Sequence, residues 1–124
     1  MRLSEAIREG SKDAVQINGH FWDGGNGYCA MGMAMRALGI KIGLTDKAAN
    51  ASFDELMNMF PMLESDAENT ANRTIGSFIW DANDNRGLSP SQIADAVEVF
   101  ENRISNARLL KTPAQENVAV LQPA

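Results

Sequence analysis

Apolar residues recur at three- and four-residue spacing through much of the chain, which is the pattern of amphipathic helices. The three clearest stripes lie within residues 53–60, 71–82 and 93–107. Each stripe is preceded by a Ser-x-x-Glu or Ser-x-x-Gln sequence, which begins at Ser52, Ser65 or Ser89. In this capping box the serine hydroxyl accepts a hydrogen bond from a first-turn amide, while the Glu or Gln accepts from the serine amide. The pattern predicts helices that start at these serines, the first of which ends before Pro61.

Residues 28–38 form a different kind of helical segment, because they are apolar on nearly every side and Arg36 is their only charge. A helix of this kind belongs in the middle of a fold. Gly39 followed by Ile40 predicts a Schellman ending. Gly32, in the middle of the segment, indicates that another element packs closely against it.

The N-terminal segment carries a weaker apolar face, formed by Leu3, Ala6, Ile7 and Ala14. It predicts a helix that begins after Ser4. The fold class is therefore all-α, with about five helices in which the apolar helix at 28–38 is central and the later helices pack around it.

A glycine-rich segment separates the first two helices, with four glycines among residues 18–27. Its backbone is expected to be irregular, with some positive φ angles. Asn18-Gly19 and Asp23-Gly24 are hairpin-turn dipeptides, so the sequence also allows a short β-ribbon within residues 16–28.

The length of 124 residues fits one domain of common size. Helical periodicity stops at Pro113, after which residues are small or polar. We therefore predict a single helical domain over residues 1–112 and a C-terminal tail over residues 113–124.

The charge balance narrows the choice of partners. The net charge of −5 disfavours direct binding to nucleic acid or to an anionic membrane. No apolar stretch approaches the roughly 20 residues that span a bilayer, and no secretion signal is evident. A single cysteine fits a reducing compartment. These features predict a cytoplasmic protein.

Cys29 is the first candidate for chemistry. It is placed near the start of a helix, where free amides and the helix dipole lower the pKa of a thiol. His20 is the only histidine and could serve as its base, which would make a nucleophilic pair. The alternative interpretation is that Cys29 is a small buried apolar residue.

The same loop offers an anion site. The amides of Gly25, Asn26 and Gly27 precede a helix and could bind phosphate or carboxylate, with Asn83 or Asp84 nearby. The sequence is not a P-loop, because no Gly-Lys-Ser/Thr follows. The alternative is that these glycines only make a tight turn. Phe21, Trp22 and Trp80 could form a recognition surface, although core packing is the more common role of such aromatic residues.

No metal or cofactor is expected. Three residues share the spacing of EF-hand calcium ligands: Asp81, Asn83 and Asn85. However, Arg86 and Gln92 occupy the positions where that loop needs Gly and Glu. A helix–helix corner, with Gly87 in the left-handed conformation and Ser89 as the next cap, fits better. One Cys and one His cannot make a closed zinc site.

Two stretches together carry a family resemblance. Residues 28–32 (Tyr-Cys-Ala-Met-Gly) precede Ala-Leu-Gly at 37–39, and residues 83–97 contain an Asn-Asp pair followed by Ser89 and an Ile-Ala pair. Both resemble signatures of a family of small bacterial, prophage and phage proteins without an established activity, and residues 3–10 are similar to the start of its phage-borne members. The resemblance implies a mobile-element context and marks Cys29, Gly32, Asn83 and Asp84.

Three functional hypotheses follow. The first is a phage- or prophage-type accessory protein that binds a host or virion protein, with a symmetric homodimer as a variant of the same idea. The second is a small-ligand binder that uses the loop before Cys29. The third is a Cys29-dependent enzyme, which requires an exposed Cys29 within reach of His20.

Overall fold

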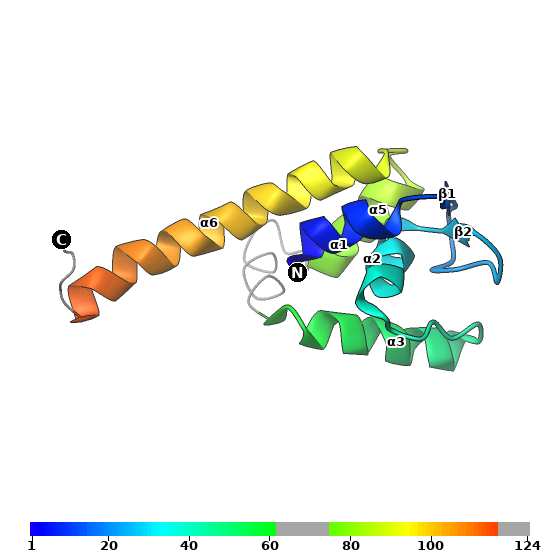
Figure 1. Ribbon diagram of the computed structural model, residues 1–124, viewed down its shortest axis with the longest axis horizontal. Coiled ribbons are helices and arrows are strands. Elements are labelled where there is room, and N and C mark those ends of the chain that lie inside the picture. Colours follow the sequence, from blue (N-terminus) through cyan, green and yellow to red (C-terminus); the bar gives the residue numbers. More distant parts are fainter. Residues whose placement is uncertain (62–74, 117–124) are drawn as a thin grey trace.

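The computed structural model describes residues 1–61 and 75–116, with side chains through residue 104 (Figure 1). The described elements follow one another as α1 (Leu3–Gly10), β1 (Val15–Gln16), β2 (Gly27–Tyr28), α2 (Ala30–Leu38), α3 (Asp46–Asn58), α5 (Ile75–Asp84) and α6 (Pro90–Glu116). The predominantly helical fold class is confirmed. In the described part of the chain, no helix is long and apolar enough to cross a membrane.

Helix α2 occupies the centre of the fold, as its apolar sequence predicts. Six consecutive residues, Ala30–Met35, are buried. The helix packs against α1, α3 and α5, whereas α6 packs mainly on α1 and α5. The last helix therefore joins the fold through those neighbours and not chiefly through α2, which corrects the expected arrangement. The Schellman ending is confirmed, since Gly39 has a φ of 75° and the amide of Ile40 donates to the carbonyl of Met35 at 3.0 Å.

The capping box at the start of α6 is present as predicted. The hydroxyl of Ser89 accepts from the amide of Gln92 at 3.1 Å, and the Gln92 side chain accepts from the amide of Ser89 at 2.9 Å. Before it, Gly87 has a φ of 63°, which confirms the predicted helix–helix corner. Of the stripe predicted for the preceding helix, Ile75, Ile79 and Ala82 are fully buried in α5. Its proposed start at Ser65 and its first apolar residue, Ala71, lie outside the described residues.

The predicted start of α3 at Ser52 is wrong. The helix begins at Asp46, where the side chain of Thr45 accepts from the amide of Ala48 at 3.2 Å. Ser52 lies in mid-helix and is buried; its hydroxyl donates to the carbonyl of Lys41 and accepts from the amide of Gly43. Because the hydroxyl bonds to these two backbone groups of the preceding loop, Ser52 attaches that loop to the helix instead of capping it.

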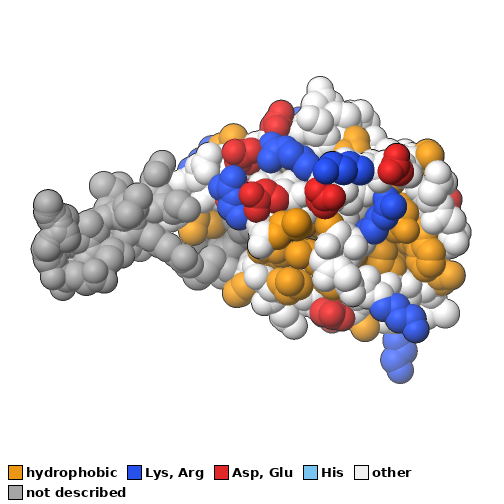
Figure 2. Space-filling model, viewed as in Figure 1, with side chains coloured by type: hydrophobic (Ala, Val, Ile, Leu, Met, Phe, Trp, Pro, Cys, Tyr) orange, Lys and Arg blue, Asp and Glu red, His pale blue; other side chains and the backbone are white. Residues whose placement is uncertain are grey.

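The predicted start of α1 also shifts, from Ser4 to Arg2. The amide of Arg2 donates to the carboxylate of Glu5 at 2.7 Å. Ser4 is buried inside the helix, and both its amide and its hydroxyl donate to the carboxylate of Glu101 on α6. Around this contact, Arg8 forms ion pairs with Asp95 and Glu98 at 2.7 Å. Basic and acidic side chains accordingly lie next to one another where α1 meets α6 (Figure 2).

The two short strands of this region pair in parallel, with Val15 opposite Gly27 and Gln16 opposite Tyr28. The chain reverses twice between them, at Gly19 with a φ of 84° and at Gly24 with a φ of 89°. Two reversals return the chain to its original direction, so the two turn signals predict the bends correctly. Across the second turn, Trp22 and Tyr28 form an isolated antiparallel bridge, so hairpin-like pairing is present at Asp23-Gly24 but the strands themselves are not a hairpin.

Helix α6 runs to Glu116 and extends away from the rest of the fold (Figure 1). It therefore passes Pro113 and continues beyond the expected domain boundary at residue 112. The fixed φ of proline is compatible with helical backbone, but inside a helix the missing amide donor and the crowding of its ring typically cost about 3 kcal/mol.

Candidate functional site

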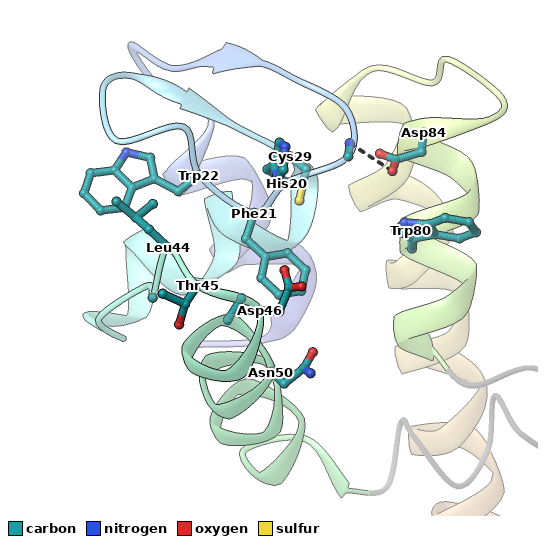
Figure 3. A pocket seen from close by; sticks show the side chains of 13 residues that line it. His20, Phe21, Trp22, Cys29, Leu44, Thr45, Asp46, Asn50, Trp80 and Asp84 are labelled. Atoms are coloured by element: carbon teal, nitrogen blue, oxygen red, sulfur yellow. Dashed lines mark hydrogen bonds between the residues drawn. The ribbon is translucent and has the colours of Figure 1, made fainter.

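Two adjoining cavities lie between residues 19–22, the start of α3 and helix α5, and Figure 3 shows the first of them. The first has a volume of about 360 Å³ and the second about 250 Å³. They share Phe21, Asn50 and Trp80 as lining residues. We treat them as one continuous depression and call it the α3–α5 groove.

Phe21 is held in the groove by its backbone contact with α2. Its carbonyl oxygen accepts from the amide of Cys29 at 3.2 Å and lies 1.8 Å from where a Cβ on Gly32 would be. Only glycine allows this approach, as the sequence predicted for a mid-helix Gly32. The ring of Phe21 then stacks on Phe53 of α3, with centroids 6.1 Å apart. Both rings line the second cavity, together with Met31.

Large apolar side chains are exposed at the groove. Trp80 is 53% exposed and Leu44 is 66% exposed. Trp80 lines both cavities, whereas Leu44 lines only the first. Core packing was the favoured role for the aromatic residues, and for Trp80 it is wrong. Its position outside the buried Ile75–Ile79–Ala82 stripe of α5 is the sequence signal that could have shown this.

The charged residues that line the groove are acidic. Asp46, in the first turn of α3, is exposed, and Asp84, at the end of α5, is partly buried. The carboxylate of Asp84 accepts from the amide of Gly19 at 3.0 Å and from the side-chain amide of Asn83 at 2.8 Å. His20 also lines the first cavity and is exposed. No Lys or Arg of the described residues lines either cavity.

Asn83 has a different role from the predicted ligand contact. It is 2% exposed, and its side-chain oxygen accepts from the amide of Ala30 and from Gln16. Its side-chain nitrogen donates to the carbonyl of Ile17 and to Asp84. Asn83 therefore ties the first loop and the start of α2 to α5, and it does not line the groove.

The predicted anion site at Gly25, Asn26 and Gly27 is already filled by the chain's own carboxylate. Asp23 Oδ1 accepts from the amides of Gly25 and Gly27 at 2.8 and 3.1 Å. The carbonyl of Asn26 accepts from Val15. An aspartate that bonds to amides two and four residues ahead is a turn-forming arrangement. None of these three residues lines the groove, so the structure brings only Asp84 of the proposed ligand contacts into it.

Cys29 is the N-cap residue of α2 and is 6% exposed. Burial raises the pKa of its thiol to about 11, and the nearby charge of Asp84 adds to the effect. The amides of Gly32 and Met31 lower the pKa but are outweighed. The expected activation at the helix start is thus contradicted, because loss of hydration exceeds the gain from the amides.

His20 is not placed to deprotonate the Cys29 thiol, since no hydrogen bond joins the two residues in the described structure. Both residues line the first cavity, but the exposed thiol that a Cys29 nucleophile requires is missing. Within residues 1–61 and 75–104, no three His, Cys, Asp or Glu side chains cluster as metal ligands would.

Comparison with models of known protein families, with curated proteins and with solved structures finds no match to this chain.

Proposed function

We propose that this chain is a small binding protein that holds a segment of another protein in the α3–α5 groove. In this proposal the partner is a host or virion protein, met in the cytoplasm of a bacterium. The phage and prophage context rests on the resemblance in residues 28–39 and 83–97. The main support for a binding role is the groove itself, which is lined by the exposed Trp80.

Two features favour a peptide segment as the occupant. The groove consists of two cavities that share a wall, which suits successive side chains of one bound segment. Tryptophan is also among the residues that contribute most to protein interfaces. An indole that stays 53% exposed retains much of its apolar surface for burial by a partner.

A small ligand is the second candidate, because the first cavity, at about 360 Å³, lies within the range of small-molecule sites. The groove would be its site, in place of the loop before Cys29.

The proposal is tested by selecting short random peptides on the purified protein and measuring their affinity by fluorescence polarisation. Trp80→Ala is expected to weaken groove-bound peptides by about 30-fold, which corresponds to a hot-spot loss of about 2 kcal/mol. Val99→Ala is the matched control, since Val99 is 51% exposed on α6 and lies outside the groove.

Failure to enrich any peptide, or equal binding to both variants, would contradict the proposal. Native mass spectrometry of the purified protein distinguishes peptide binding from small-ligand binding. Small-ligand binding predicts a retained small molecule that is absent from Trp80→Ala. A concentration-dependent dimer that Trp80→Ala abolishes would replace the foreign partner with a second copy of the chain.

A further inference from the structure

The two cavities of the α3–α5 groove differ in chemical character. The first cavity contains both carboxylates, from Asp46 and Asp84, whereas the described lining of the second is free of charged side chains. The second cavity is instead lined by Phe21, Met31 and Phe53, among others. A bound segment therefore meets an acidic site beside an apolar one.

Asp84 is fixed in place and still able to bind. Its Oδ2 accepts from the amide of Gly19 (Figure 3), and its Oδ1 accepts from the side chain of Asn83. Each carboxylate oxygen can accept two hydrogen bonds, so both oxygens retain capacity toward the groove. Two carboxylates without a described Lys or Arg in the lining leave an uncompensated negative charge.

Trp80 adds a second attraction for a cation. It precedes Asp84 by four residues on α5, so the two side chains lie on one face of the helix. An indole face attracts Lys and Arg side chains more strongly than other rings do. Within the fold itself, the guanidinium of Arg36 already lies over the ring of Tyr28, 5.2 Å from its centre.

We infer that the groove recognises an arginine or lysine side chain together with an apolar side chain adjacent to it on a bound protein segment. The cation occupies the first cavity, near Asp46, Asp84 and Trp80. The apolar side chain occupies the second cavity against Phe21 and Phe53. This inference rests on the proposed function, because it names the segment that the groove holds.

The test uses short acetylated and amidated peptides that differ at one position, which is Arg, Lys, Gln or norleucine. Blocked termini leave the side chain as the only variable charge. Changing Arg or Lys to Gln or norleucine is expected to weaken binding at least about tenfold. Asp46→Asn should reduce that preference to about threefold or less, because one of the two carboxylates loses its charge.

Asp54→Asn is the matched control, since it removes the same charge from an exposed residue of α3 that does not line the groove. It is expected to keep the full preference. Increasing salt should weaken the Arg and Lys peptides but not the norleucine peptide.

Peptides that need Trp80 but bind equally well with norleucine would overturn the inference and leave the proposed function standing. Equal preference in Asp46→Asn and Asp54→Asn would also overturn it. The absence of any Trp80-dependent peptide would instead remove the proposed function.

Discussion

The thiol of Cys29 shows how strongly the surroundings of one residue determine its chemistry. Amides at the start of α2 favour the thiolate, but burial disfavours it more and raises the pKa to about 11. The consequence is a thiol that stays protonated and unreactive at neutral pH, even though it lines a cavity.

The raised pKa of Cys29 predicts how stability changes with pH. The unfolded thiol ionises near its ordinary value of 9.0, whereas the folded thiol retains its proton up to about 11. Between these values the unfolded state binds fewer protons, so the free energy of unfolding falls as the pH rises, by about 1.4 kcal/mol per unit. Below pH 9.0 both states are protonated and the contribution is constant.

Urea unfolding of the wild type and of Cys29→Ser at several pH values measures this effect. Serine does not titrate, so the difference between the two proteins isolates the thiol from tyrosine and lysine titration. A difference that does not change with pH would show that the thiol is not buried as described.

Residue-scale reasoning from sequence was correct for Gly32 and Gly39 but not for Asn83. A glycine within a helix usually allows close packing, and a glycine just after a helix usually takes the left-handed conformation, so both roles can be predicted from sequence. The partners of Asp23 and Asn83 depend on which backbone groups the folded loops leave unpaired. For Asn83 those backbone groups belong to residues 53 and 66 positions away in the chain.

At the scale of elements, α2 determines where residues 19–22 lie. The close contact between Gly32 and the carbonyl of Phe21 lets the loop rest directly on the helix. Any side chain at this position would push Phe21 away from Phe53 and change the groove.

Gly32→Ala tests this packing. A Cβ would lie 1.8 Å from the Phe21 oxygen, so the loop must move. Overpacking of this kind typically costs about 1–3 kcal/mol, which exceeds the gain in helix propensity of up to about 1 kcal/mol. We expect a lower unfolding midpoint in urea.

Gly25→Ala is the control for Gly32→Ala, because the nearest atom to its added Cβ is Asp23 Oδ1 at 3.4 Å. Its stability is expected to stay within about 0.5 kcal/mol of the wild type. If Gly32→Ala were as stable as Gly25→Ala, the loop would not be anchored on α2.

The starts of α6 and α3 show what local sequence can and cannot predict about an element. Ser89 and Gln92 form a capping box because Pro90 fixes the helix start between them. Ser52 and Glu55 have the same spacing, but Thr45 supplies an earlier cap. The polar and small residues between Thr45 and Ser52 lack an apolar stripe, so periodicity alone misses the first turns of the helix.

At the scale of the whole molecule, Asn83 ties α5 to the first loop and to the start of α2. It bonds to Gln16, Ile17 and Ala30 from α5, and it supports Asp84, which in turn holds Gly19. Because Gly19 and Asp84 both line the first cavity, this buried amide helps to position one wall of the groove.

Asn83→Ala leaves the amide of Ala30 and the carbonyl of Ile17 without their partner. Each buried unsatisfied group costs about 1–3 kcal/mol, so we expect a loss of about 3 kcal/mol in the free energy of unfolding. Urea unfolding measures it, with Asn85→Ala as the control. Asn85 is exposed, and among the described residues its side chain bonds only to Asp81. Equal stability of the two variants would contradict the role given to Asn83.

The mostly helical fold was predictable as a whole because apolar periodicity reports directly on buried helix faces. The groove was not, since it is defined by surfaces that three distant segments leave uncovered. Of the proposed catalytic and ligand-binding residues, Asp84, His20 and Cys29 line it and the others do not. The recognition surface suggested for Phe21, Trp22 and Trp80 also lies there, although core packing was favoured for these aromatic residues. Thr45, Asp46 and Asn50 carry no motif that distinguishes them from an ordinary helix start.

The bond between Ser4 and Glu101 joins residues 97 positions apart, and it connects α1, an early helix, to α6, a late one. On the ribosome, α1 can pack against α2 soon after both have been made, but its contacts with α6 have to wait for the last described helix. Folding of this chain is therefore expected to finish only after most of it has been synthesised. Until α6 is made, the buried Ser4 of α1 lacks the carboxylate to which its amide and hydroxyl donate.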